Sequence, residues 1–204
     1  MSKDAAITAE VIYLCISSIV ARLPYAATAP VHSFVIRFII PAMSLRLATL
    51  ALIVKDGKVL LGEKKKGAEI GSGTLNGPGG KADSKPDGTM ERPEECIVRE
   101  TREEIDIQLD PTKLEKIGTM TFFAAGEADF QVVVFRTETF VGEPSETSSM
   151  FPPQWYPLDA LPFDRMLESD REWFARAAAG EKFDADVFYK ERAKDFERIQ
   201  FKFK

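Results

Sequence analysis

The chain has 204 residues, and its 27 basic and 32 acidic side chains give a formal net charge of -5. This length suits one domain with a substantial core, and the negative balance argues against polymeric nucleic acid as a partner. The single histidine, His32, excludes a histidine-rich zinc site and argues against a Ser-His-Asp triad. Cys15 and Cys96 cannot form a disulfide framework, which favours a reducing compartment such as the cytoplasm.

Residues 1–42 differ in composition from the rest of the chain. The apolar run 11–20 is too short to span a membrane, so no membrane association is expected. With residues 27–29 as a cleavage-site mimic, it resembles a signal peptide, but nearby acidic residues offset Lys3 and remove the positive start. A mitochondrial presequence would contain more arginine and less acid. We expect residues 1–42 to be an extension outside the folded unit, and residues 43–204 to form the domain.

Two strands and a glycine-rich loop begin that domain. Residues 45–54 predict a buried strand, Asp56-Gly57 a hairpin turn, and residues 58–64 the returning strand. Residues 67–80 include six glycines and one proline, which predicts tight backbone turns. Glycines allow the backbone to approach a phosphate-bearing ligand closely, whereas the alternative is a flexible surface loop.

A helix is predicted over residues 93–105, because Pro93 suits the first helical position and the acids after it suit the positive end. One face can be buried through four residues at helical spacing, namely Ile97, Val98, Thr101 and Ile105. The other face carries Glu100, Glu103 and Glu104 at positions i, i+3 and i+4. Their repulsion becomes favourable when a divalent cation binds between them, and the alternative is a solvated acidic face.

The remaining elements predict an α+β fold. Strands are expected at 114–124, 131–139 and 154–158, and a second helix at 170–179. Residues 125–129 are expected to separate the first two of these strands. The apolar, β-branched run 130–135 indicates a central strand. Residues 182–203 are charged with regularly placed aromatics and are expected to add a final strand or helix. Strands with interleaved, non-alternating helices are typical of α+β proteins.

The helix and the loop before it carry a pattern that resembles the Nudix box. The matching residues, in order, are Gly80, Glu91, Arg99-Glu100, Glu103-Glu104 and Ile107. Three departures stand out, which are an apparent insertion at 83–88, Thr101 in place of an aliphatic residue, and Asp106 in place of the glycine that ends the helix. An aspartate can end a helix in the left-handed conformation, though less favourably than glycine.

Residues 45–189 resemble one Nudix branch in particular, the MutT-homologue type that hydrolyses oxidised purine nucleoside triphosphates. The segments that carry this likeness are residues 60–65, 75–81, 155–158 and 161–166, followed by Asp170 and Trp173-Phe174. The resemblance implies the Nudix fold, a mixed β-sheet sandwiched between α-helices. It also implies Mg²⁺ as the cofactor, with Mn²⁺ as a substitute.

The resemblance assigns roles residue by residue. Glu100, Glu103 and Glu104 would bind the metal, and Glu103 or Glu104 would also take a proton from the attacking water. Arg99 would assist catalysis by pairing with Glu91, which would brace the loop against the helix. Substrate-binding positions would be Asn76 at the purine, Lys64 at the pocket entrance, Asp170 at the base edge, and Gly79 and Gly80 near the phosphates.

Three positions depart from this branch where the base and the metal would bind. Ser169 stands where the first of two adjacent acids is expected, and Leu167 stands where a flanking aromatic is expected. Ser149 stands in place of a loop acid that assists metal binding. Losing an acid removes a hydrogen-bond acceptor, and losing an aromatic removes a stacking surface, so base specificity could shift or broaden.

These residues predict metal-assisted hydrolysis at phosphorus of 8-oxo-dGTP or 2-hydroxy-dATP, which yields a nucleoside monophosphate and diphosphate and cleans the nucleotide pool. The protein is expected to act as a cytoplasmic monomer on small nucleotides. Two alternatives remain open. One is a Nudix hydrolase of ADP-ribose or a nucleotide sugar, and the other is a binding module without catalysis.

Overall fold

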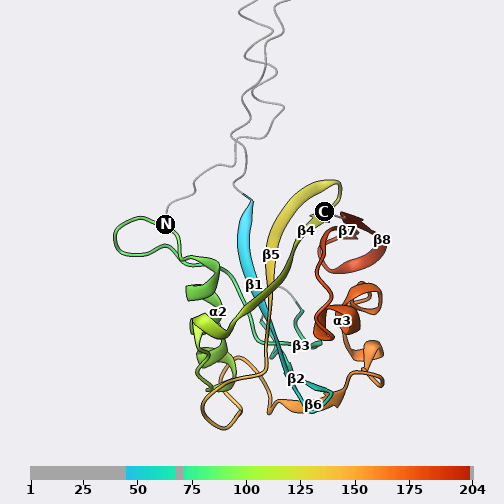
Figure 1. The fold of residues 1–204 in the computed structure, drawn as a ribbon. Helices are drawn as coiled ribbons and strands as arrows, with labels where there is room; N and C mark the ends of the chain where they lie inside the picture. The colour runs from blue at the N-terminus through green and yellow to red at the C-terminus, as the bar shows by residue number, and fades with distance from the viewer. Residues whose placement is uncertain (1–44, 68–70, 203–204) are drawn as a thin grey trace, which may run out of the picture. The chain divides into compact units, whose positions relative to one another are not determined.

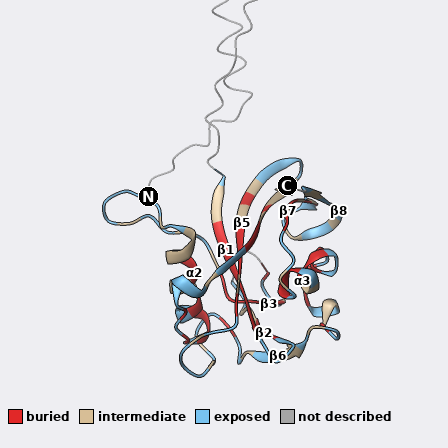
Figure 2. Ribbon diagram, viewed as in Figure 1, coloured by how far each residue is buried: buried red, intermediate tan, exposed pale blue. Residues whose placement is uncertain are grey.

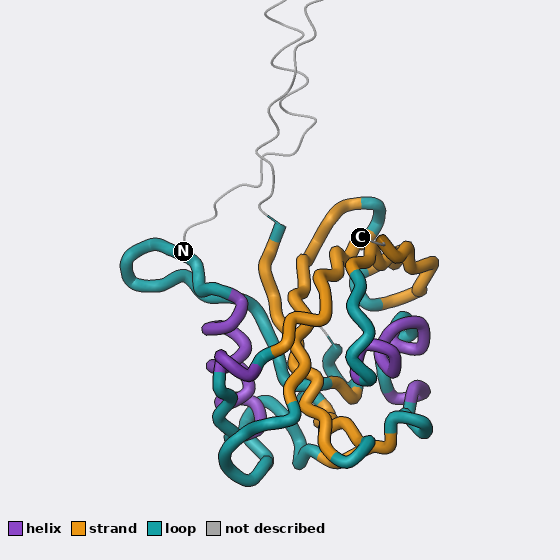
Figure 3. Tube along the Cα trace, in the orientation of Figure 1, coloured by secondary structure: helices purple, strands orange, loops and turns teal. Residues whose placement is uncertain are grey.

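The computed structural model describes residues 45–67 and 71–202, so the expected extension at 1–42 lies outside the described residues. Figures 1 and 3 show strands at the centre of this domain with helices beside them. The strands are β1 Arg46–Lys55, β2 Lys58–Glu63, β3 Leu75–Asn76, β4 Glu115–Ala124, β5 Glu127–Thr137, β6 Gln154–Pro157, β7 Asp184–Glu191 and β8 Lys194–Lys202. The helices are α2 Pro93–Ile105 and α3 Asp170–Ala178, with short 3-10 turns at Pro111–Lys113 and Phe163–Arg165.

The strands form one mixed sheet in the order β3-β2-β1-β5-β4-β7-β8, with β6 paired to β2. β1 pairs with β5 and β4 pairs with β7 in parallel, whereas the other neighbours are antiparallel. The prediction of a central strand at residues 130–135 is confirmed, because β5 lies between β1 and β4.

The sheet separates two apolar cores, one under each helix. Alternate residues of β1 point to opposite faces, so that Leu52 joins the core beneath α3 and Ile53 the core beneath α2. In Figure 2 the buried positions follow the inner strands and the inward sides of α2 and α3. The predicted mixed sheet between helices is confirmed. Within 45–67 and 71–202, no helix has the length and apolar content needed to cross a bilayer.

Helix α2 begins and ends where the sequence predicts. Pro93 lies in its first turn, and the Glu95 carboxylate accepts a hydrogen bond from the backbone N–H of Arg92. Asp106 ends the helix in the left-handed conformation, with a φ of 58°, as expected for a residue that replaces glycine there. Ile97, Thr101 and Ile105 are fully buried, as the spacing predicts, whereas Val98 is only partly buried.

Two expectations differ from the structure. The segment expected to separate two strands at 125–129 is only a two-residue turn, Ala125-Gly126, in which both residues have positive φ. Such a turn matches strand twist and allows β5 to begin at Glu127, which places Asp129 within a strand. The charged end of the chain, expected as one strand or helix, is the antiparallel pair β7–β8 joined at Arg192-Ala193.

Replacing Ile53 by valine should lower the free energy of unfolding by about 1 kcal/mol, because one methylene leaves a fully buried site in the core beneath α2. Urea denaturation followed by circular dichroism measures the change. Val141→Ala is the control, because Val141 is 74% exposed and should shift stability by less than about 0.5 kcal/mol. Equal losses in the two variants would contradict the core assignment.

Candidate active site

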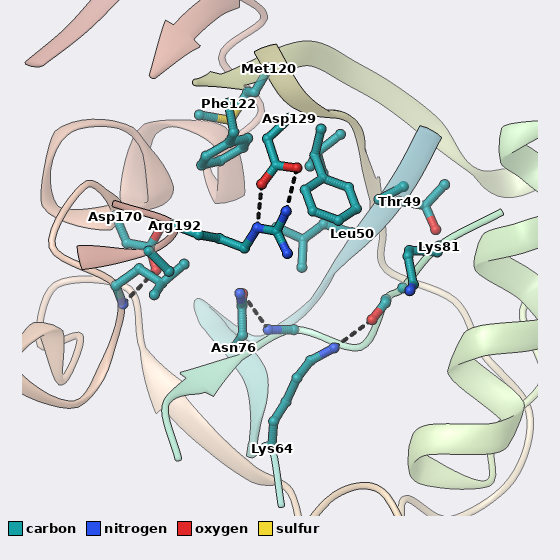
Figure 4. Close-up of a pocket in the computed structure, with 18 of the residues that line it drawn as sticks. Thr49, Leu50, Lys64, Asn76, Lys81, Met120, Phe122, Asp129, Asp170 and Arg192 are labelled. Carbon is teal, nitrogen blue, oxygen red and sulfur yellow. Dashed lines mark hydrogen bonds and ion pairs between the residues drawn. The ribbon is translucent and has the colours of Figure 1, made fainter. Parts of the chain in front are cut away.

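A cavity of about 300 Å³ opens between β1, the glycine-rich loop, α2 and the strands next to α3. Its lining differs from one end to the other (Figure 4). One end carries Glu100 and Glu104 of α2 together with Lys64 and Gly79-Gly80. The other end is largely apolar, and its lining includes Met120, Phe122, Phe130, Leu167 and Trp173. The cavity therefore offers charge to one part of a ligand and an apolar surface to another.

The glycine-rich loop lies directly against β1 because the glycines in it have no side chains. The backbone N–H of Thr49 donates to Gly80 O at 2.8 Å, and that of Ala51 donates to Pro78 O at 2.9 Å. A Cβ atom at Gly79 would lie 2.1 Å from Thr49 O, so only glycine allows this approach. The loop thus presents backbone atoms, rather than side chains, to the charged end of the cavity.

Glu104 connects α2 to this loop. It is only 7% exposed, its Oε2 accepts a hydrogen bond from Gly79 N at 2.8 Å, and its Oε1 pairs with Lys64 Nζ at 2.9 Å. Lys64 Nζ also donates to Gly79 O at 2.5 Å. Lys64, which was expected at the pocket entrance, lines the cavity, with its ammonium group held between two oxygen atoms.

Glu100 lies one turn earlier on the same wall, under Gly80. A Cβ atom at Gly80 would lie 2.5 Å from the Glu100 carboxylate, so the carboxylate occupies space that only glycine leaves open. Burial raises the pKa of Glu100, and the negative charge of Glu104 raises it further, whereas Arg99 opposes both effects. A cation bound beside both carboxylates would lower that pKa and relieve their repulsion.

Glu103 is directed elsewhere. Its side chain is 58% exposed, and Oε2 pairs with Arg99 Nη1 at 3.0 Å, outside the cavity lining. Arg99 also pairs with both oxygens of Glu91, at 2.9 and 2.8 Å, and donates to Lys81 O. The hydrogen bond from Arg99 is the main reason why the pKa of Glu91 is lowered. These contacts make Arg99 a positioning residue that ties the loop to α2.

The oxygen atoms at the charged end of the cavity are suitable ligands for a hard divalent cation. Within the described ranges, no three acidic, histidine or cysteine side chains converge closely enough to coordinate a metal together. Glu100 and Glu104 nevertheless share one wall, and the Lys64 ammonium lies between a carboxylate and a carbonyl oxygen, as a cation would. Carboxylate and carbonyl oxygens are what Mg²⁺ and Mn²⁺ prefer. Glu103 would join them only by turning away from Arg99.

Replacing Gly80 by alanine should reduce kcat for the predicted hydrolysis by about 30- to 100-fold. The new methyl group would push the Glu100 carboxylate out of place. Stability should change little, since the displaced atoms are the end of a flexible side chain. Gly57→Ala is the matched control. Its Cβ meets nothing within 4 Å, but its φ is +70°, so it should cost about 1 kcal/mol of stability and leave kcat unchanged. Equal kcat values in the two variants would contradict this role for Gly80.

At the apolar end, Asp170 is the buried polar group. It is 1% exposed at the start of α3, and its carboxylate accepts a hydrogen bond from Leu167 N at 3.2 Å. Burial raises its pKa to about 7. Trp173 Nε1, one turn later in the cavity wall, is buried with no hydrogen bond of ordinary geometry in the described part of the chain, although it lies near enough to Asp170 to oppose the rise in the pKa of that carboxyl. A ligand that supplies an acceptor would satisfy it.

The departures from the resembled pattern have structural consequences. Ser169 is fully buried, and its hydroxyl accepts a hydrogen bond from Tyr189 at 2.8 Å instead of lining the cavity. Leu167 does line the cavity, as an aliphatic wall. Ser149 is exposed, and in the same loop Glu146 pairs with Lys65 at 2.6 Å rather than with the α2 acids.

Asn76, which was expected at the purine, lines the cavity, and its Oδ1 accepts a hydrogen bond from Gly77 N at 2.9 Å. The lining residues that were not predicted from the sequence include Asp129 and Arg192, which pair with each other at the apolar end (Figure 4). Asp129 was expected in a loop and Arg192 in a charged terminal segment. Neither position carries a local motif that would indicate a pocket.

Comparison with known proteins supplies independent findings. The model of the NUDIX domain matches residues 44–177. An oxidized purine nucleoside triphosphate hydrolase from Danio rerio is 41% identical over 130 residues, which cover 63% of this chain and 77% of that protein. A mouse protein with the same description is 35% identical over 139 residues, 68% of this chain and 83% of that one.

Solved structures agree with the fold. A MutT NUDIX hydrolase from Burkholderia pseudomallei superposes with a TM-score of 0.52 at 28% identity, covering 65% of this chain and 94% of that one. A MutT protein from Bacillus halodurans gives a TM-score of 0.60 at 19% identity, covering 77% of this chain and 97% of that one, and supports the fold alone.

Proposed function

The chain belongs to the Nudix family, and on that premise we propose that it hydrolyses oxidised purine nucleoside triphosphates, such as 8-oxo-dGTP or 2-hydroxy-dATP, to the monophosphate and diphosphate. The two relatives described as oxidized purine nucleoside triphosphate hydrolases support this substrate class. Nudix hydrolases require a divalent metal, and we propose Mg²⁺, with Mn²⁺ able to replace it.

The main observation behind the proposal is that a single cavity joins an acidic wall to an apolar end with a buried aspartate. The acidic wall, with Glu100 and Glu104, suits a metal-bound triphosphate. The apolar end, with Phe122, Trp173 and Asp170, suits a flat purine that has polar groups on its edge. A binding module without catalysis would gain nothing from two carboxylates held together at a cost in repulsion.

The residues at the charged end of the cavity would have different roles in hydrolysis. A bound divalent metal would neutralise phosphate oxygens and lower the pKa of a water molecule. Glu100 and Glu104, with Glu103 after a change of rotamer, would hold that metal, and one of these carboxylates would accept the proton of the attacking water. Lys64 would offset phosphate charge at the wall. Gly79 and Gly80 keep the backbone close to the phosphates, and Arg99 and Glu91 keep α2 in register with the loop.

The test is a substrate panel with the full chain. In Mg²⁺, 8-oxo-dGTP should give 8-oxo-dGMP and diphosphate, separated by anion-exchange chromatography, at a higher kcat/KM than ADP-ribose or a nucleotide sugar. Chelation with EDTA should abolish turnover, and added Mn²⁺ should restore it. A preference for ADP-ribose would replace this proposal with a different Nudix activity. If no compound in the panel is hydrolysed, only a binding role remains.

We further propose that the enzyme acts as a cytoplasmic monomer. The proposed substrates form when nucleotides of the cellular pool are oxidised. Cys96 is a free, buried thiol, which is compatible with a reducing compartment. Light scattering on the purified chain tests the oligomeric state, and a mass twice that of one chain would contradict it.

A further inference from the structure

The apolar end of the cavity contains one guanidinium group. Of the described residues that line the cavity, the basic ones are Lys64, Lys81 and Arg192. Both lysines belong to the charged end, beside the glycine-rich loop. Arg192 instead comes from the β7–β8 turn, and in Figure 4 its side chain runs from the side of Asp170 towards Asp129. It therefore lies where the proposed function places the purine.

The Arg192 guanidinium is held in one orientation. Its Nε and Nη2 donate to the two oxygens of Asp129 at 2.5 and 2.8 Å. Asp129 is only 11% exposed and also pairs with Arg46, so its carboxylate is anchored from two sides. The Phe130 ring lies under both arginines, 3.9 Å from Arg46 Cζ and 5.5 Å from Arg192 Cζ. A group fixed in this way loses little side-chain entropy when it meets a ligand.

A guanidinium group distinguishes purines by the group at C6. It can only donate hydrogen bonds, because it carries five N–H donors and no acceptor. Guanine-type bases present a carbonyl oxygen at C6, whereas adenine-type bases present an amino group, which is a donor. Oxidation at C8 adds the same carbonyl to both types. Selection between the two types by a donor therefore requires the Arg192 guanidinium to face the C6 edge of the base, because the C8 carbonyl is common to both.

We propose that Arg192, positioned by Asp129, faces the C6 edge of the base and makes this pocket selective for 6-oxopurines, so that 8-oxo-dGTP is preferred over 8-oxo-dATP and 2-hydroxy-dATP. This inference rests on the proposed function and names its substrate subclass. Arg192 supplies the donor to the base, and Asp129 acts as a positioning residue that keeps the donor at the apolar end.

The chain contains a closely matched control. Arg46→Gln removes one positive charge, one partner of Asp129 and one contact with the Phe130 ring, as Arg192→Gln does. Arg46, however, does not line the cavity. A glutamine in place of Arg192 can turn its amide to present either a donor or an acceptor, so discrimination should be lost. Arg192→Lys retains donors only but loses the two-point pairing with Asp129, so it should retain most of the preference.

The experiment measures the ratio of kcat/KM for 8-oxo-dGTP to that for 8-oxo-dATP. We expect Arg192→Gln to lower this ratio about tenfold, Arg192→Lys to keep it within threefold of wild type, and Arg46→Gln to leave it within twofold. Thermal denaturation verifies that each variant is folded. An unchanged ratio in Arg192→Gln, or an equal fall in Arg46→Gln, would show that the pair only fastens β5 to the β7–β8 turn.

Binding of the products separates this inference from the proposed function. Calorimetric titration with 8-oxo-dGMP and 8-oxo-dAMP needs neither metal nor turnover, and the Kd ratio should shift as the kcat/KM ratio does. If wild type hydrolyses neither triphosphate but binds 8-oxo-dGMP more tightly through Arg192, the hydrolysis proposal fails and base selection stands. If it hydrolyses both at equal kcat/KM, base selection fails and hydrolysis stands.

Discussion

Replacing Glu104 by glutamine is expected to lower kcat about a thousandfold, which corresponds to about 4 kcal/mol of transition-state stabilisation. The carboxylate lies at the junction of α2, Lys64 and the Gly79 backbone and lines the cavity. An amide of the same shape still accepts one hydrogen bond but carries no charge to hold a metal or take a proton. Steady-state release of diphosphate from 8-oxo-dGTP measures the effect.

Glu94→Gln is the control for this substitution, because Glu94 lies in the first turn of the same helix and does not line the cavity. It should keep kcat within about twofold of wild type. Wild-type turnover in Glu104→Gln would remove the acidic wall from the mechanism. Unfolding temperatures of both variants must remain close to that of wild type for the comparison to hold.

Asp170→Asn should change how stability depends on pH. The pKa of Asp170 is raised from 3.8 to about 7 by burial, so the folded protein keeps a proton that the unfolded chain releases near pH 4. The stability contributed by that proton is complete below pH 3.8 and is lost as pH rises through 7. The variant lacks this dependence, so it should gain up to about 4 kcal/mol relative to wild type between pH 4 and pH 8.

Urea denaturation at intervals across this pH range measures the difference. Asp159→Asn is the matched control, because Asp159 is exposed on a turn and its replacement should leave the pH dependence of wild type in place. Parallel curves for Asp170→Asn and wild type would mean that the carboxylate is ionised in the folded protein at neutral pH. If Asp170→Asn instead gained stability over wild type as the pH fell below 4, the effect of pH would have the opposite sign to the one expected.

The sequence predicted α2 well, and the reason is local. Pro93, the apolar spacing of Ile97, Thr101 and Ile105, and the left-handed Asp106 act within a few residues of one another. Interactions this close in sequence do not depend on the rest of the fold. The hairpin at Asp56-Gly57 was predicted for the same reason, and its glycine has the positive φ that the turn requires.

The three glutamates show where local spacing stops being informative. Spacing places Glu100, Glu103 and Glu104 on one helical face, and Arg99 pairs with both Glu100 and Glu103. Glu103 nevertheless stays 58% exposed outside the cavity lining, whereas Glu100 and Glu104 enter the cavity wall. The difference arises from the neighbours. Gly79 and Lys64 meet Glu104, and Gly80 leaves room for Glu100, all of which come from segments placed by the sheet.

The sequence by itself therefore determined the acidic helix and the glycine loop, because each is a short pattern of neighbouring residues, and it determined the family because such patterns follow one another in a recognisable order along the chain. Only the tertiary structure decided the apolar end of the cavity. Asp129 and Arg192 lie 63 residues apart, and they meet because a two-residue turn starts β5 early and because β7 pairs with β4 in parallel. The Ser169 hydroxyl likewise accepts a hydrogen bond from Tyr189, which lies 20 residues away in the sequence. Strand pairing sets such distances, and no local pattern carries that information.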